Sequence, residues 1–250
     1  MAAYDRMLID IAGGIATVTL NRPEKMNAFD RPMTDELIAA LRMVTGSEQV
    51  RVVILTGAGR AFCAGADLSV LQSDGPALVT AGKEIALLLR QAPQPVIAAV
   101  NGAAAGGGAN LALACDYRIA SSDAQIGQVF HRLGLGPDWG GSYFLPRLTS
   151  ISTALELVWS ARMVPATEAH TLGLFDRVVP AAGLLDAARA LAACWAAHPP
   201  LAVRRAKEGL YASGGATLTS MLDWEIQQQN ELFATPDARE RIGQSLTRSR

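Results

Sequence analysis

The chain is poor in the residue types that build disulfide frameworks and zinc sites. It has three cysteines and three histidines in 250 residues. Cys63, Cys115 and Cys194 lie far apart with no C-x-x-C pair, and the histidines lack the spacing typical of metal ligands. The cysteines therefore indicate small core residues in a reducing compartment, the cytoplasm, and we expect no metal site.

The chain also lacks an excess of charge of either sign. Lys plus Arg total 22 and Asp plus Glu total 23, which gives a formal charge of −1. A nucleic-acid-binding domain usually carries a basic patch or stripe, and no basic stripe with interleaved aromatic residues is present. Four arginines near the C-terminus alternate with acidic and polar residues and predict a solvated tail (Arg239, Arg241, Arg248 and Arg250). We expect no nucleic-acid partner.

One uncharged stretch has the length of a membrane span. Residues 96–115 are twenty residues without a formal charge, long enough to cross a bilayer. The stretch is mostly Ala and Gly, however, and is short of the Leu, Ile and Phe that drive insertion. A glycine triplet interrupts it, and the first six residues of the chain show no signal-peptide pattern. We therefore expect no membrane partner.

Apolar residues, by contrast, make up 50% of the chain, enough for one large core with a small appended domain. In the first 150 residues, patterns typical of strands alternate with patterns typical of helices. The expected strands are 15–20, 52–55, 96–100 and 117–120, and the expected helices are 30–44, 74–90 and 109–115. This alternation predicts an α/β protein with a mostly parallel sheet and helical crossovers.

From about Ser150 the pattern changes to a succession of helices. The expected helices are 151–161, 167–172, 184–197, 201–211 and 218–232, interrupted only at Val164 and at residues 178–179. Gly173 suits a C-terminal cap, and the pair Pro199-Pro200 marks a break between helices. A helical tail is therefore expected after the α/β core.

Two glycine-rich stretches each follow a strand pattern. The first contains A-F-C-A-G-A-D-L (residues 61–68), and the second contains A-V-N-G-A-A-A-G-G-G (residues 99–108) before a helix of small residues. Glycines at a helix N-terminus let a ligand approach bare backbone N–H groups, to which the helix dipole adds partial positive charge. Such a loop can stabilise an oxyanion. Close packing of the helix on a neighbouring strand is an equally good explanation of the second stretch alone.

Together and in this order, the two stretches resemble the two signature loops of the crotonase superfamily, the enoyl-CoA hydratase/isomerase family. The resemblance runs from about Ile15 to Phe233. It implies a crotonase-like spiral core of ββα repeats at residues 1–195, with the oxyanion hole and the CoA site, followed by a C-terminal helical region at residues 196–250. In the family this region trimerises the protein, which implies a homotrimer or a dimer of trimers. Helices that pack only on their own sheet are the alternative.

The resemblance also implies an acyl-CoA thioester as the substrate and no separate cofactor, because coenzyme A enters with the substrate. Two backbone N–H groups, one from each glycine loop, then stabilise the thioester oxygen of an enolate. By the motif these are the N–H groups of Ala66 and Gly107. Gly107→Val should block the thioester.

For the CoA moiety, the resemblance points to two segments. In the family the loop around the first motif wraps the adenine, so backbone contacts are expected from Ala64, Ala66, Asp67 and Leu68. The family motif N-R-P-x-x-x-N-A occurs at residues 21–28, which suggests Lys25 for a phosphate and Met26 for the base. A solvated Lys25 without a ligand is an equal alternative, and Arg22 is expected to close the turn.

The acid/base residues depart from the hydratase pattern of the family. Hydratases hold a water between two glutamates, one three residues after the middle glycine and one after a Gly-Gln-Pro. The corresponding residues here are Asn110 and Phe130. Because neither an amide nor a phenyl ring can act as a general base, hydration is disfavoured. We expect Asn110 to orient the acyl chain and Phe130 to shape the pocket.

A carboxylate follows shortly afterwards, in G-P-D-W-G-G (residues 136–141). This segment resembles that of the ring-modifying enoyl-CoA isomerases of phenylacetate degradation, in which the aspartate faces the acyl carbons and shuttles a proton. Apolar neighbours such as Trp139 should raise the pKa of Asp138 toward the working pH. The alternatives are that Asp138 caps the helix expected at Gly140, or that His131 is the base.

We therefore expect an isomerase of fatty acid or phenylacetate metabolism. Asp138 removes a proton from the carbon that the thioester acidifies and returns it two carbons along, which shifts a double bond or isomerises a ring. Other fates of the enolate remain open, including hydration of a 2-enoyl-CoA and hydrolysis of the thioester. A non-catalytic acyl-CoA-binding homologue is the alternative from another functional class.

Overall fold

The computed structural model describes residues 4–248, and its main element is a six-stranded sheet. The strand order is β1 (Met7–Ala12), β2 (Ile15–Leu20), β3 (Val52–Gly57), β5 (Val96–Val100), β7 (Tyr117–Ser121) and β10 (Arg177–Val179). Strands β1 and β2 form an antiparallel hairpin, and each later neighbour pairs in parallel. The four predicted strands are confirmed as β2, β3, β5 and β7, with β3 and β7 extending slightly further.

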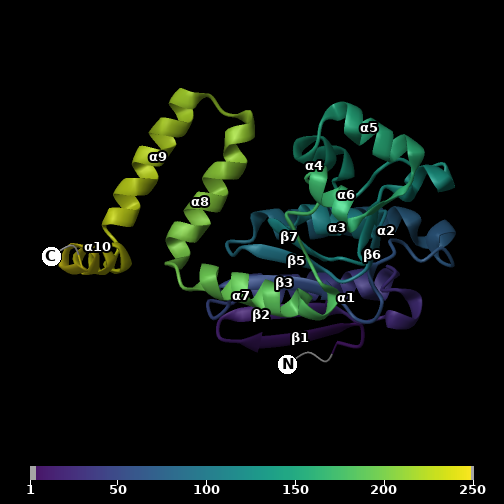
Figure 1. Ribbon diagram of the computed structural model, residues 1–250, viewed down its shortest axis with the longest axis horizontal. Coiled ribbons are helices and arrows are strands. Elements are labelled where there is room, and N and C mark those ends of the chain that lie inside the picture. The colour runs from purple at the N-terminus through teal and green to yellow at the C-terminus, as the bar shows by residue number, and fades with distance from the viewer. Residues whose placement is uncertain (1–3, 249–250) are drawn as a thin grey trace.

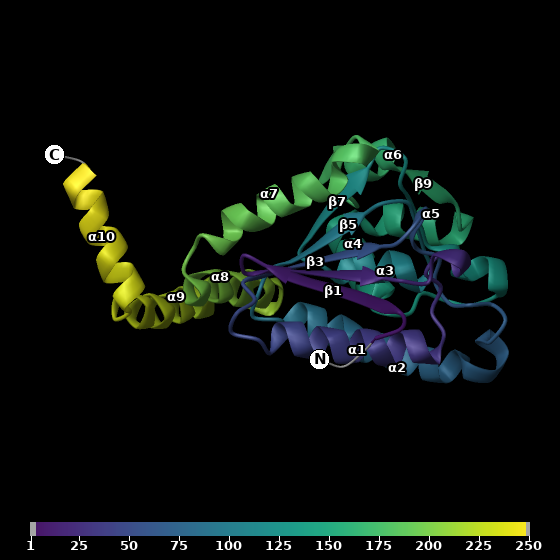
Figure 2. The same cartoon turned by 90° about the horizontal axis from the view of Figure 1, so that it is seen from below.

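Helices cover both faces of this sheet, as parallel sheets require. Helices α1 (Arg31–Thr45) and α2 (Leu71–Gln91) lie along one face and α7 (Leu184–Ala196) along the other (Figure 2). Alternate residues of each strand supply the two cores, because successive side chains point to opposite faces. In β3, for example, Val53 and Leu55 belong to the cluster that contains α1 and α2, whereas Val52 and Ile54 pack with α7.

A second, smaller sheet carries the glycine loops. Its order is β4 (Ala61–Cys63), β6 (Ala103–Ala105), β8 (Gln125–Gly127) and β9 (Met163–Pro165). Around it lie α3 (Gly107–Ala114), α4 (Gly141–Leu148), α5 (Ile151–Ser160), α6 (Ala166–Thr171) and the 3-10 turn η2 (Val129–Leu133). Two further 3-10 turns follow strands of the large sheet, η1 (Pro23–Lys25) after β2 and η3 (Ala181–Gly183) between β10 and α7. Strands of three residues are too short to show a periodic pattern, and the sequence did not predict this sheet.

The helix signals in the sequence were accurate for α1 and less so for α2. Asp30 caps α1 as predicted, because its side chain accepts a hydrogen bond from Met33 N at 3.0 Å. Helix α2 begins at Leu71, before the predicted start at residue 74, and Pro76 lies inside it. Asp74 N already donates to Val70 O, so the helix is established before it reaches the proline.

The C-terminal helices extend away from the body of the molecule (Figure 1). They are α8 (Pro200–Ala212), α9 (Leu218–Phe233) and α10 (Pro236–Arg248), with the turn η4 (Ser213–Gly215) after α8. Helix α8 buries only Gly209 and α9 buries no residue. Lys207 Nζ anchors α8 to the body through Asp116 Oδ2 at 2.7 Å. Arg239 and Arg241 are exposed, as predicted, and lie on α10, whereas Arg250 lies outside the described residues.

The overall arrangement confirms the predicted fold class, an α/β core followed by helices. Among residues 4–248, no helix combines the length and the apolar composition that are needed to cross a bilayer.

Candidate active site

The two glycine loops lie side by side because they follow neighbouring strands. Strands β4 and β6 pair in parallel, with Ala61 opposite Ala103 and Cys63 opposite Ala104, so their carboxyl ends meet at one edge of the small sheet. The loops touch closely there. A Cβ atom on Gly65 would lie 2.7 Å from Ala105 O and 3.6 Å from Gly107 N, and the φ of Gly65 is +91°. Only glycine fits this position in both respects.

A backbone bridge determines the direction of the Ala66 N–H. Phe29 N donates to Gly65 O at 2.7 Å, and Asp67 N donates to Phe29 O at 2.8 Å. Gly65 C=O therefore points at Phe29. In a trans peptide the N–H of the next residue points the opposite way, so the Ala66 N–H points away from Phe29. It donates to no other atom of the described residues.

The Gly107 N–H is free to donate to a ligand because Gly107 is the first residue of α3. The first four N–H groups of a helix have no partner within it. Asn110 N makes the first α-type bond, to Gly106 O, whereas Gly106 N donates to Gly127 O. Within residues 4–248, Gly107 N has no acceptor, and the positive end of the helix dipole adds to its field. Both predicted donors are thus unpaired, on loops in contact.

Asp138 lies on the loop between η2 and α4, where its carboxyl is half-buried. Burial raises the pKa of this carboxyl from 3.8 to about 6. Its Oδ1 is buried and has no hydrogen-bond partner within the described part of the chain. The capping alternative does not hold, because α4 begins after Gly140 and no side chain caps it. His131 is exposed.

Trp139 links Asp138 to the second glycine loop. A Cβ on Gly107 would lie 3.5 Å from the Trp139 ring, so the indole packs directly on the Gly107 backbone. The ring also stacks on Phe29, with centroids 4.3 Å apart, and its Nε1 donates to Leu78 O at 3.1 Å. Trp139 therefore contacts one predicted donor residue, Gly107, directly and reaches the Ala66 loop only through Phe29. From the sequence, Trp139 is expected only as an apolar neighbour of Asp138.

The residues that replace the two hydratase glutamates are buried. Asn110 is fully buried, and its Nδ2 donates to the main-chain oxygen of Asp138 at 2.9 Å, while its Oδ1 accepts from Gln128 Nε2 at 2.7 Å. A contact between Asn110 and the acyl chain stays a prediction, since the amide here binds protein groups. Phe130 is 7% exposed, and its ring lies 3.7 Å from a Cβ built on Gly106, beside the second loop.

The residues predicted to bind CoA come together around the first loop. Ala64 N donates to Met26 O at 3.0 Å, which places the Lys25–Met26 turn beside the loop. Lys25 and Leu68 are exposed, and Met26 is 36% exposed. Because the N–H groups of Ala64 and Asp67 already donate within the protein, their remaining contacts with a ligand would run through other atoms.

Arg22 anchors the loop that carries Ala66 through an ion pair with Asp67. Its guanidinium lies 2.8 Å from Asp67 Oδ2 and 3.4 Å from Asp30 Oδ2, and it donates to Ala28 O. Hydrogen bonds from Ser69 and the Arg22 charge lower the pKa of Asp67 to about 2. Arg22 therefore does more than close its own turn, because it fixes the residue next to Ala66. Its place in the N-R-P motif was the only signal in the sequence.

The chain is similar to members of one known family. The family model described as enoyl-CoA hydratase/isomerase matches residues 10–248. A probable enoyl-CoA hydratase of Rhodobacter capsulatus is 41% identical, covering 96% of this chain and 94% of that protein. The 1,2-epoxyphenylacetyl-CoA isomerase of Escherichia coli is 36% identical, covering 97% and 95%.

A crystal structure of an enoyl-CoA hydratase from Bacillus anthracis superposes with a TM-score of 0.93 at 36% identity, covering 98% of this chain and 97% of that one. This match extends over the core, both glycine loops and the C-terminal helices, and it confirms the crotonase fold. The chain belongs to the enoyl-CoA hydratase/isomerase family.

Proposed function

We propose that the protein is an isomerase of unsaturated acyl-CoA thioesters that moves one proton through Asp138. The observation that carries the proposal is a single half-buried carboxyl, with a pKa raised to about 6, on a loop packed against Gly107. The positions of the two hydratase glutamates hold Asn110 and Phe130. One group that accepts and returns a proton near neutral pH is sufficient for an allylic shift.

The mechanism uses the two unpaired amides and the carboxylate in turn. The thioester oxygen of a 3-enoyl-CoA accepts hydrogen bonds from Ala66 N–H and Gly107 N–H, which stabilise the negative charge that develops there. Asp138 removes a proton from C2, the electron pair spreads over a dienolate, and the protonated carboxyl, whose proton can exchange with solvent, delivers a proton to C4, leaving a 2-enoyl-CoA. Each backbone donor of this kind typically contributes roughly 3–4 kcal/mol to the transition state.

We propose that CoA lies along the first loop. The adenine contacts the backbone of Ala64 and Ala66, the side of Met26 and the neighbourhood of Asp67 and Leu68. Lys25 meets a phosphate. Support comes from the main-chain hydrogen bond between Ala64 N and Met26 O, which brings the first loop and the Lys25–Met26 turn together, and from the exposure of Lys25.

We propose further that residues 1–195 form the catalytic core and that residues 196–250 assemble it into a homotrimer or a dimer of trimers. The helices after Pro199 carry many exposed apolar side chains: Leu210, Leu218, Leu222, Ile226, Phe233, Ile242 and Leu246. A mass measurement by light scattering tests this assembly. The three cysteines are free thiols, which is in keeping with a place in the cytoplasm.

The test is the variant Asp138→Asn, with the exposed Asp123→Asn as its control. We expect Asp138→Asn to lose about 10²- to 10⁴-fold in kcat for conversion of a 3-enoyl-CoA, the usual contribution of a general base. Uptake of solvent deuterium at C2 should fall in parallel, with acyl-CoA binding retained. Undiminished turnover in Asp138→Asn, or acyl-CoA binding without turnover in the unmodified protein, would contradict the proposal.

Two relatives suggest what else to assay. The similarity to the Rhodobacter capsulatus protein, a probable enoyl-CoA hydratase, favours hydration as the second candidate function. The similarity to the Escherichia coli 1,2-epoxyphenylacetyl-CoA isomerase favours a ring substrate within the isomerase proposal. Incubation with 2-enoyl-CoA and with ring-bearing acyl-CoA thioesters separates these cases, because only a hydratase forms the 3-hydroxyacyl-CoA.

A further inference from the structure

Gln128 is a buried glutamine that the proposed reaction does not use directly. It lies between β8 and η2, is 3% exposed, and its Nε2 donates to Asn110 Oδ1 at 2.7 Å. Its Oε1 is buried without a partner in residues 4–248. A buried amide oxygen without a hydrogen bond is unfavourable for folding. Such a group calls for an explanation from its surroundings.

The side-chain amide of Gln128 is the first member of a short chain of hydrogen bonds that ends at the main-chain oxygen of Asp138. Asn110 accepts from Gln128 and donates through Nδ2 to the main-chain oxygen of Asp138 at 2.9 Å. Gly141 N donates to the same oxygen at 2.8 Å. A Cβ on Gly141 would lie 2.5 Å from Asn110 Nδ2, so the glycine makes room for this contact. Since each amide polarises the next, such a chain is stronger than its separate bonds.

The backbone at this point needs support from its surroundings. Trp139, directly after Asp138, has a φ of +47°, a left-handed conformation that side chains other than glycine rarely adopt. Such a residue persists only when neighbouring contacts hold it. The indole is held by Phe29 and Leu78, and the peptide oxygen before it is held by Asn110 and Gly141. These contacts hold the backbone from which the Asp138 side chain extends.

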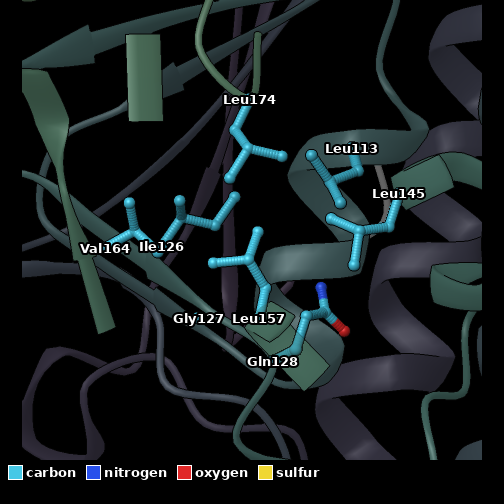
Figure 3. Close-up of a pocket in the computed structure, with 8 residues that line it drawn as sticks. All are labelled: Leu113, Ile126, Gly127, Gln128, Leu145, Leu157, Val164 and Leu174. Carbon is cyan, nitrogen blue, oxygen red and sulfur yellow. The ribbon is translucent and has the colours of Figure 1, made fainter. Parts of the chain in front are cut away.

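In the part of the chain that the structure describes, Asn110 is the only side chain that hydrogen-bonds to the amide of Gln128. The amide of Gln128 lies at the edge of a small cavity with aliphatic walls (Figure 3). The walls are formed by Leu113, Ile126, Leu145, Leu157, Val164 and Leu174. Asn110, for its part, must donate to Asp138 O. A glutamate at position 110 is only an acceptor when ionised, and it would lose this bond.

We infer that Gln128 is a positioning residue for the proton transfer: through Asn110 it holds the main-chain oxygen of Asp138 and thereby the direction of the carboxyl toward the acyl carbons. This inference rests on the proposed function of Asp138. It assigns Gln128 to the reaction, although the residue itself touches no reacting atom.

The experiment replaces Gln128 with Met, which keeps the volume and removes both the donor and the unpaired oxygen. Gln94→Met is the matched control, because Gln94 is also buried, has an unpaired Oε1, and uses its Nε2 to bind two carbonyls (Thr45 O and Val50 O) away from the site. We expect Gln128→Met to lower kcat about 10- to 100-fold, as displacement of a reacting group does. KM should change by less than about 3-fold on the same grounds, and Gln94→Met should keep wild-type kcat.

A double-mutant cycle shows whether Gln128 acts through Asn110. If it does, Asn110→Ala combined with Gln128→Met loses no more kcat than Asn110→Ala alone, whereas additive losses overturn the inference. If the Met variant does not fold, Gln128→Leu replaces it, because leucine also cannot donate to Asn110 but has a different shape. Wild-type kcat in Gln128→Met beside an inactive Asp138→Asn overturns the inference alone. Full activity of Asp138→Asn overturns the proposed function instead.

Discussion

The two loops that carry the proposed donors are held by different kinds of interaction. The Ala66 loop is fixed by charge: Arg22 pairs with Asp67 at 2.8 Å and with Asp30 at 3.4 Å. The neighbourhood of Gly107 is fixed by neutral contacts. There the Trp139 ring packs on the glycine, and the amides of Gln128 and Asn110 lead to the main chain of Asp138.

The difference explains why two aspartates on neighbouring loops are suited to different tasks. The hydrogen bonds from Ser69 and the Arg22 charge lower the pKa of Asp67 to about 2, so this carboxylate is ionised throughout the physiological range. Burial without a charged partner raises the pKa of Asp138 to about 6, which suits a group that must accept and return a proton. A cation beside Asp138 would lower the pKa of its carboxyl again. The loop from Gly134 to Gly140 contains no Lys or Arg.

After Asp138→Asn, the largest effect should come from a side chain at Gly107, whose N–H is the proposed donor on the neutral side of the site. A Cβ on Gly107 would lie 3.5 Å from the Trp139 ring, and the branched side chain of Gly107→Val would occupy the space beside the N–H that we propose as a donor to the thioester. We expect a loss of about 10²- to 10³-fold in kcat/KM, comparable with the loss of one oxyanion donor. Gly183→Ala is the control, since a Cβ there meets nothing within 4 Å. Full activity of Gly107→Val would exclude this amide as a donor.

A pH profile compares the two aspartates in the unmodified protein. If Asp138 acts as the base, kcat/KM rises with pH and levels off above about 6, the pKa of this carboxyl. Below that value the ionised fraction, and with it the rate, falls about tenfold per pH unit. Asp67 stays ionised over the same range and contributes no change. A rate that is flat between pH 5 and pH 8 would show that no group with the pKa of Asp138 limits the reaction.

Removal of the Arg22 charge beside the Ala66 loop should lower activity less than Gly107→Val does, but it should clearly lower stability. Arg22→Met leaves two largely buried carboxylates, Asp67 and Asp30, without this partner. We expect the free energy of unfolding to fall by about 3 kcal/mol and kcat/KM to fall about tenfold as the Ala66 loop loosens. Arg42→Met breaks an exposed pair with Glu84 and should change stability by less than about 1 kcal/mol. Equal effects of the two variants would argue against a special role for Arg22.

Neutralising each aspartate should have small effects on stability, in opposite directions for the two residues. The folded-state pKa of Asp67 is depressed, so its carboxylate stabilises the fold above about pH 4 and loses this contribution as pH falls toward 2. The folded-state pKa of Asp138 is raised, so its carboxylate destabilises the fold increasingly between about pH 4 and pH 6.

At pH 7, Asp67→Asn should therefore lower the free energy of unfolding by about 1–3 kcal/mol. Asp138→Asn should raise it by about 1 kcal/mol, after allowance for partial solvent exposure. Urea denaturation at pH 7 and pH 4 measures both, and the gain in Asp138→Asn should shrink at pH 4. Two variants that shift stability in the same direction would contradict the comparison.

Local signals in the sequence were sufficient for most of the fold. The apolar runs gave the central strands, and Asp30 with Pro32 gave the start of α1, because strand periodicity and helix capping depend on residues a few positions apart. The two glycine motifs, through their resemblance to a known family, indicated Ala66 and Gly107, and the separate resemblance of residues 136–141 indicated Asp138. Periodicity could not reveal β4, β6 and β8, since three residues show no repeat.

The contacts that hold the site together were decided only by the tertiary structure. Gln128 and Asn110 are 18 residues apart, Asn110 and Asp138 are 28 apart, and Trp139 and Leu78 are 61 apart. No local pattern encodes such pairs, because their hydrogen bonds form only after the sheets have brought distant loops to one edge. The sequence by itself determined the strands, the caps and the residue types available for chemistry. The packing of the chain decided which of those residues meet, because burial and distance are properties of the folded molecule.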